Sequence, residues 1–306
     1  MSRYWLLAVG AGLLSALMYA LLTTGSALAF VLAYFIQLPI FLAGLGLGAL
    51  AGAGAGAVGL VALVAVNGVL TAALYLTMIL PALVLVQRAL LARRSQSGDM
   101  AWYPPGLLAT WLAGMALAAL AAAMLAMAEH PGGLEGAVRE VVRANLNAMP
   151  FRIAENQEAL EQGAARILPG MVLFSWMLMT ILNGGVAQGL LMRAGRNVRP
   201  AVDIAELELP WLAPIALAGA LGLAVFGDGW LGFFGINAVA IIALPFFLAG
   251  LAVVHALVRP RASRRAILAG FYFLFVILFP WPAILLAGLG LIEQWAHLRR
   301  RFLAQA

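Results

Sequence analysis

Apolar runs long enough to cross a lipid bilayer recur along almost the whole chain. Hydrophobic residues make up 65% of the 306 residues and charged residues only 10%, too little polar surface to cover a soluble domain. Because lipid offers backbone N–H and C=O groups no partner, runs of about 20 residues cross it as helices. The sequence therefore predicts an all-α, polytopic transmembrane helical bundle. The apolar segments are 4–23, 27–48, 49–66, 68–88, 104–128, 168–192, 210–226, 231–257, 266–280 and 282–298.

The first apolar run imitates a secretory signal. Arg3 precedes it, and the small residues 27–29 that follow resemble a cleavage site. However, the run from Tyr4 to Leu22 has 19 residues, longer than a signal core, and membrane-like sequence continues after residue 29. We expect an uncleaved first helix rather than a cleaved signal.

The chain contains neither cysteine nor lysine, so all 18 of its basic residues are arginine. The lack of thiols excludes disulfides, thiolate zinc sites and cysteine nucleophiles. The lack of amines excludes Schiff-base chemistry and a P-loop lysine. We expect no cofactor.

Arginines gather in short clusters between the apolar segments and give the chain most of its net charge of +6. Cytoplasmic loops of membrane proteins carry such an excess, so we interpret the clusters as topology signals and expect no nucleic-acid partner. Both termini are then cytoplasmic, and an even number of crossings separates successive clusters. Ten crossings satisfy this condition, or eight if one pair is re-entrant. The clusters are Arg3; Arg88, Arg93 and Arg94; Arg193, Arg196 and Arg199; Arg259, Arg261, Arg264 and Arg265; and Arg299, Arg300 and Arg301.

The longest polar stretch, 129–166, holds six Glu against four Arg and so belongs on the outer side. Its apolar residues between 134 and 146 follow helical spacing, Glu135 and Arg139 form an i,i+4 pair, and Pro150 is expected to end the helix. This pattern predicts either an amphipathic helix on the outer membrane face or a solvated helical hairpin that joins two spans.

A glycine-rich stretch in the second and third apolar segments contains the spacing of a dinucleotide fingerprint. That motif needs a preceding strand, which this sequence does not offer. The glycines are typical of close helix packing, or of a locally unwound, re-entrant segment. They are Gly44, Gly46, Gly48, Gly52, Gly54, Gly56 and Gly59.

The first helix carries a stripe of small residues at every fourth position, defined here as the small-residue stripe: Ala8, Gly12, Ala16 and Ala20. Such a stripe is an interface between helices. It meets either another helix of the same chain or a separate membrane partner.

Amides and His255 are the polar side chains expected within or near the membrane, and no carboxylate falls at a midplane. This disfavours a proton relay or an intramembrane aspartyl protease. The three histidines share no metal-binding spacing, so we expect no metal site. Four amides are candidates for a ligand cavity, although amides also serve as bonds between helices: Asn67, Asn183, Gln188 and Asn237.

Three passages carry a family resemblance: Leu38–Phe41 before the glycines, Asn237 before the helix at 250–253, and the ending 288–295 before the last arginines. The chain resembles the DUF2232 (YybS-like) family of predicted bacterial membrane proteins, which is distantly similar to the S components of energy-coupling-factor transporters. The resemblance implies a six-helix N-terminal region, 1–192, that includes the outer segment 129–166. Residues 193–306 then form an additional set of membrane helices.

These features suggest three functions. The leading hypothesis is a non-enzymatic, multi-pass protein of the bacterial inner membrane that binds a small solute or lipid-like molecule for transport, in a cavity lined by its first six helices. Because it lacks an ATPase motif, a membrane coupling subunit with ATPase would dock on the small-residue stripe. The second hypothesis is a scaffold or assembly factor that recruits proteins. The third, a lipid-acting enzyme, lacks an identifiable nucleophile. The oligomeric state is left open.

Overall fold

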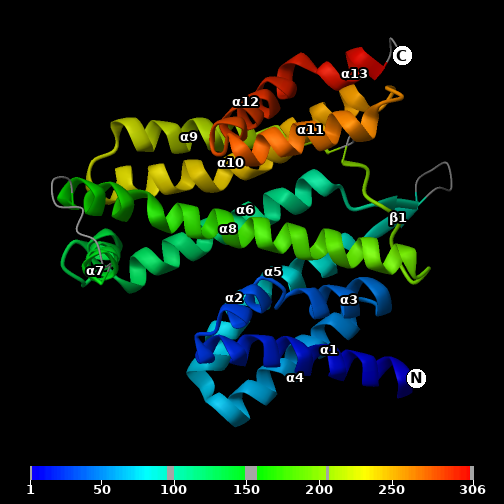
Figure 1. Ribbon diagram of the computed structural model, residues 1–306, viewed down its shortest axis with the longest axis horizontal. Helices are drawn as coiled ribbons and strands as arrows, with labels where there is room; N and C mark the ends of the chain where they lie inside the picture. Colours follow the sequence, from blue (N-terminus) through cyan, green and yellow to red (C-terminus); the bar gives the residue numbers. More distant parts are fainter. Residues whose placement is uncertain (1, 95–99, 149–156, 205–206, 304–306) are drawn as a thin grey trace. The chain divides into compact units, whose positions relative to one another are not determined.

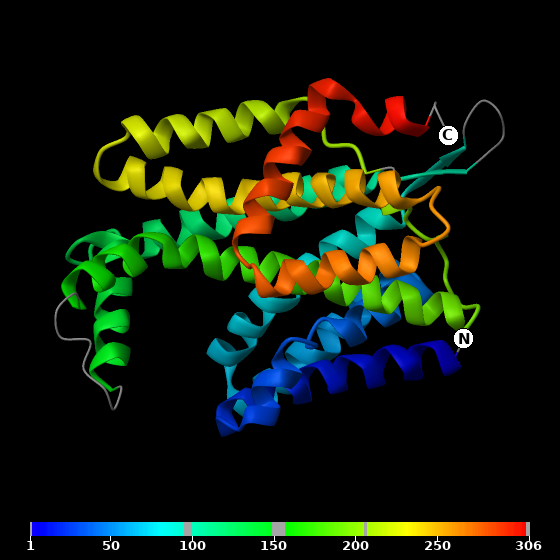
Figure 2. The ribbon, with the colours of Figure 1, turned by 45° about the horizontal axis from the view of Figure 1, so that its top comes forward.

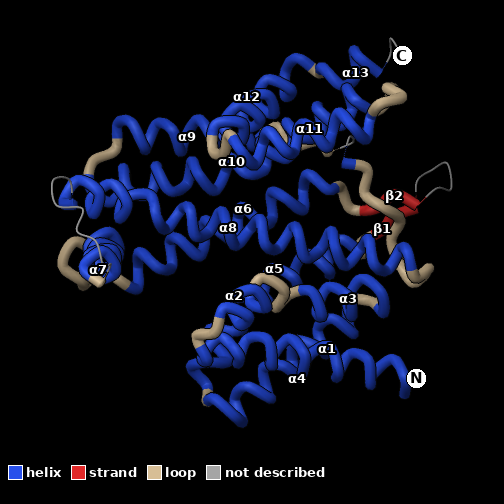
Figure 3. The backbone as a smooth tube through the Cα atoms, in the orientation of Figure 1, coloured by secondary structure: helices blue, strands red, loops and turns tan. Residues whose placement is uncertain are grey.

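The computed structural model of the chain describes residues 2–94, 100–148, 157–204 and 207–303. In these ranges the chain is mostly helical, with one hairpin in which β1 (Ala92–Arg94) pairs antiparallel with β2 (Met100–Trp102) (Figure 3). The predicted all-α class is confirmed.

Seven helical stretches in the described residues are long and apolar enough to cross a membrane. The predicted segment 210–226 forms only α9 (Leu212–Phe226), whose 15 residues extend about 22 Å, short of the roughly 30 Å hydrocarbon core. This short helix and a bent pair described below explain why ten apolar segments yield fewer candidate spans. The seven candidate spans are Arg3–Thr24, Ala27–Leu47, Ala49–Asn67, Val69–Ala89, Pro105–Ala126, Gln157–Arg193 and Gly229–Val258.

The last two apolar segments form α11 (Arg264–Ile277) and α12 (Trp281–Ala296), which are bent by 120° at the break between them. A broken span continues in roughly its first direction, whereas a bend beyond a right angle turns the chain back toward the side on which it entered (Figure 2). This geometry fits a re-entrant pair, which also leaves the arginines before α11 and after α12 on one side of the membrane.

The chain folds into two compact units: Met1–Leu108 with Leu178–Val202, and Ala109–Met177 with Asp203–Ala306. This division differs from the one implied at residue 192. The reason is α8 (Gln157–Arg193), a helix of 37 residues that begins in the polar segment and contributes to both units.

The first unit is built from α1 (Ser2–Ala20), η1 (Leu21–Thr24), α2 (Ala27–Ala33), α3 (Leu38–Leu47), α4 (Ala49–Asn67), α5 (Val69–Ala89) and the end of α8. Gly48 and Gly68 make the turns on either side of α4, at φ of 108° and 85°, which favour glycine. The helices consequently run back and forth, and α1 lies beside α4 (Figure 1).

The second unit surrounds α10 (Gly229–Val258), the most extensively buried helix in the described chain. α9 folds back along it, and α12 crosses it (Figures 1 and 2). Gly250 and Gly290 lie where α10 and α12 meet, because a Cβ atom at either glycine would collide with the other helix's backbone. The unit also contains all of α7 (Gly133–Asn147) and α13 (Leu298–Leu303), and most of α6 (Pro105–Ala126).

Candidate functional site

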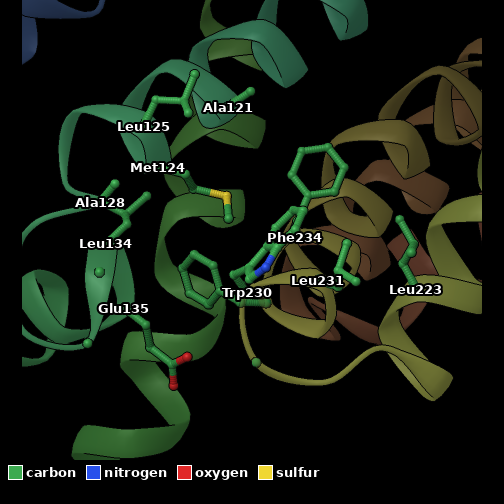
Figure 4. Close-up of a pocket in the computed structure, with 14 residues that line it drawn as sticks. Ala121, Met124, Leu125, Ala128, Leu134, Glu135, Leu223, Trp230, Leu231 and Phe234 are labelled. Carbon is green, nitrogen blue, oxygen red and sulfur yellow. The ribbon is translucent and has the colours of Figure 1, made fainter.

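A cavity of about 770 Å³ lies in the second unit, where the end of α6 and the start of α7 face the α9–α10 turn (Figure 4). Every residue that lines it belongs to this unit. The lining residues are Ala121, Met124, Leu125, Ala128, Gly132, Gly133, Leu134, Glu135, Leu223, Gly229, Trp230, Leu231, Phe233 and Phe234.

Two glycine turns shape the cavity wall. Gly132 and Gly133 follow each other at φ of 77° and 62°, and Gly229 begins α10 at a φ of 54°. Side chains other than glycine rarely adopt this left-handed backbone, so glycine makes these sharp changes of direction possible. The first turn redirects the chain from α6 into α7, and the second reverses it from α9 into α10.

The cavity is almost entirely apolar. Met124, Trp230 and Phe234 converge on one side of it, whereas the Glu135 carboxylate lies at the edge and points away from them (Figure 4). Glu135 is the single ionisable residue of the lining, and its Oε1 lies 3.4 Å from Nη2 of Arg139, one helical turn later. The site thus combines an apolar interior with a charged pair on one side.

An ion pair connects α7 to the start of α8. Arg143 Nε donates a 2.9 Å hydrogen bond to Oε2 of Glu161 at the start of α8, and Gln157 Nε2 donates to the other oxygen of the same carboxylate. α7 is seen end-on in Figure 1, where α6 and α8 run across the view, so it crosses both helices steeply. None of its residues is buried. Pro150, predicted to end this helix, lies outside the described residues.

The four amides predicted as candidates for a ligand cavity are divided between the two units. Asn237 belongs to the second unit, where its amide bonds α8 to α10. The other three belong to the first: Gln188 donates to the carbonyl oxygen of Arg199, and Asn67 is exposed at the end of α4. Only Asn183 borders a described hollow, separate from the large cavity. A ligand role for these residues stays a prediction.

The small-residue stripe faces the interior of the first unit. Ala8, Gly12 and Ala16 are buried and Ala20 is half-buried. A Cβ atom at Gly12 would collide with the backbone carbonyl of Ala55 on α4. Of the two alternatives for the stripe, the structure therefore shows contact with a helix of the same chain, and this face is not open to a coupling subunit.

Most of the predicted glycines lie against other helices. A Cβ atom at Gly52 would meet the Cα atom of Gly44. A Cβ atom at Gly44 would meet the side chain of Val86, and one at Gly59 would meet the Tyr75 hydroxyl. Gly46, Gly54 and Gly56 approach the side chains of Leu191, Trp5 and Leu83, while Gly48 makes the α3–α4 turn. The fingerprint spacing thus lies inside α4, and the backbone it occupies is helical throughout.

Sequence reasoning did not find the cavity, because Trp230, Phe234 and Met124 resemble ordinary membrane-facing residues. The available signal was the pair of glycine turns, at 132–133 and 229, which end apolar segments on the same side of the predicted membrane. Among the residues that the structure describes, no three His, Asp or Glu side chains gather to hold a metal ion.

The apolar helices of both units and the arginine-rich turns between them define a multi-pass helical membrane protein. The predicted membrane protein family DUF2232 matches residues 13–293. The chain therefore belongs to this family. No curated protein and no solved structure matches it. The more distant resemblance to S components stays a prediction.

Proposed function

We propose that the protein binds an amphipathic, lipid-like molecule in the cavity between α6, α7, α9 and α10. The observation that carries this proposal is a volume of about 770 Å³ with a single ionisable side chain in its lining. Pockets for small molecules occupy about 300–1,000 Å³ and are mostly apolar, with a few polar groups that orient the ligand.

The lining selects for a hydrocarbon or aromatic body. Trp230 and Phe234 offer broad apolar faces, and Met124 adapts its flexible side chain to an irregular ligand. A polar head then lies at the edge, where Glu135 accepts hydrogen bonds and Arg139 donates them. The hydrocarbon chain of such a ligand packs against the apolar lining in place of membrane lipid. Its polar head lies beside Glu135 and Arg139, where both charged side chains stay solvated or paired.

The cavity's position suits a ligand that enters from the outer leaflet. If α6 and α8 cross the membrane, α7 lies nearly in the membrane plane at their ends (Figures 1 and 2). An amphipathic helix with this orientation occupies the interface between headgroups and acyl chains. With α9 as a short crossing that precedes α10, the arginines after α10 lie on the opposite, cytoplasmic side.

The role that fits this site is binding for transport, without catalysis, in the bacterial inner membrane. The lining offers Glu135 alone as an acid–base group and contains no Ser, Thr or His nucleophile. Energy for transport would come from a partner that docks elsewhere than on the small-residue stripe, because α4 covers that face.

A photo-cross-linking amino acid introduced at Met124 in living cells tests the proposal. We expect it to capture one acyl-chain molecule far above its abundance in the membrane, because Met124 faces the cavity (Figure 4). The control is the same amino acid at Ala122, which is exposed and lies outside the cavity lining. At that position it should capture membrane lipids in proportion to their abundance. Identical lipid profiles at the two positions would overturn the proposal.

A further inference from the structure

The second candidate span is interrupted at residues 34–37, between α2 and α3. Polar side chains from neighbouring helices bond the backbone there. Ser15 Oγ donates a 2.6 Å hydrogen bond to the carbonyl oxygen of Ile36, and Asn183 Nδ2 donates a 2.6 Å bond to that of Tyr34. A break in a membrane helix is tolerated where side chains satisfy its backbone, and such breaks recur at ligand sites of membrane proteins.

Two side-chain amides at this break each keep an oxygen without a donor. Gln37 is fully buried and Asn183 is 2% exposed. Gln37 Nε2 donates a hydrogen bond to the Met78 carbonyl oxygen. Asn183 Nδ2 donates its two hydrogens to the carbonyl oxygens of Tyr34 and Met179. These carbonyl acceptors fix which end of each amide is nitrogen. Gln37 Oε1 and Asn183 Oδ1 are therefore buried acceptors without a hydrogen bond, a rare state that requires an explanation.

Asn183 also borders a hollow of about 370 Å³ in the first unit, and it supplies the only amide of the lining. The hollow contains no acidic or basic residue, which disfavours a charged ligand at this depth. Its volume corresponds to about a dozen non-hydrogen atoms at roughly 30 Å³ each. The other lining residues are Phe30, Val31, Tyr34, Phe35, Met179 and Leu182.

We propose that this hollow binds an uncharged apolar molecule with a single hydroxyl group, such as a medium-chain alcohol, whose O–H donates to Asn183 Oδ1. The oxygen is buried in this structure, so the hydroxyl reaches it only when a side chain that borders the hollow moves. Tyr34 and Leu182 border the hollow, and each is more than half exposed. The hydrocarbon then packs against the aromatic side chains. This site is independent of the larger cavity, which belongs to the other unit.

Thermal unfolding of the full chain in phosphatidylcholine nanodiscs, with dodecan-1-ol or its isomer 1-methoxyundecane, tests the proposal. The two additives have equal size, but only the alcohol carries a donor. Ligands that bind the folded state raise its Tm, so we expect the alcohol to raise Tm by several degrees more than the ether. Asn183→Leu should abolish this difference, whereas Asn67→Leu, at an exposed amide of the same unit, should keep it.

A second measurement keeps the test decisive if Asn183→Leu does not fold. A diazirine-bearing alkanol should label peptides that contain Tyr34 or Asn183, and Met179→Trp should prevent labelling by filling the hollow while it keeps the backbone carbonyl that Asn183 bonds. Equal Tm shifts with alcohol and ether, or equal labelling of Met179→Trp and wild type, would overturn the proposal.

Discussion

The backbone N–H of Gly170 donates a 2.6 Å hydrogen bond to Oδ1 of Asn237, on a different helix. Nδ2 of Asn237 returns a 3.0 Å bond to the carbonyl oxygen of Arg166. The Gly170 N–H and the Arg166 carbonyl are the pair that bond each other in an uninterrupted α-helix. Asn237 thus bridges an i,i+4 pair of α8 beside Pro169, and Gly170 leaves the room for it.

Replacing Asn237 by Ala should destabilise the protein by about 2 kcal/mol, because it removes the bridge between two buried backbone groups and leaves a void. Thermal or denaturant unfolding in detergent measures this loss. Asn67→Ala is the matched control, since that amide is exposed, and should change stability little. Equal stabilities of the two variants would show that the bridge contributes nothing.

Gly290→Ala should cost about 1–3 kcal/mol of stability, because the new Cβ would press on the backbone of Phe246 where α10 and α12 cross. Gly288→Ala is a control on the same helix: a Cβ at that position meets nothing within 4 Å. Their melting temperatures should show a loss of stability for Gly290→Ala alone. A similar loss at 288 would mean that an added methyl group on α12 lowers stability whether or not it lies at the crossing with α10.

Gly12→Leu should destabilise the first unit without releasing any partner, because the small-residue stripe already packs on α4 at Ala55. Gly10→Leu, on the open side of α1, serves as the control. Unfolding curves and pull-down from mild detergent measure the two effects. Selective loss of a bound protein from Gly12→Leu, with stability unchanged, would instead favour the partner interface.

Hydropathy predicted the helices well, because the bilayer enforces them, but it could not set their lengths or bends. The run 168–192 does not reveal that α8 begins at 157, since that part is polar and is held by the contact between Arg143 and Glu161. The break at 34–37 is marked only by the Leu38–Pro39 helix start that follows it.

The candidate site depended on tertiary contacts that a single sequence does not contain. From the sequence alone, Asn237 could equally bind a ligand or bond two helices together. Only the position of Gly170 in the folded chain shows that the Asn237 amide hydrogen-bonds to α8. Trp230 and Glu135 lie far apart in the sequence, and two glycine turns bring them to one cavity.

The topology is tested by labelling single cysteines, for which the cysteine-free chain needs no background substitutions. Asn145→Cys on α7 should react only with an impermeant reagent added from outside, and Asn197→Cys only from the cytoplasm. Leu278→Cys, at the α11–α12 bend, should react poorly from either side because a re-entrant tip lies in the membrane. Strong labelling of position 278 from outside would mean that the pair crosses fully.

The most direct test of the central claim is native mass spectrometry of the purified protein with Ala121→Trp and Ala122→Trp as the two variants. Ala121 lines the cavity, so a tryptophan there fills it, whereas its exposed neighbour points elsewhere. We predict one retained lipid-like molecule in wild type and Ala122→Trp, and its loss in Ala121→Trp with folding intact. Equal occupancy in all three proteins would contradict a ligand in this cavity.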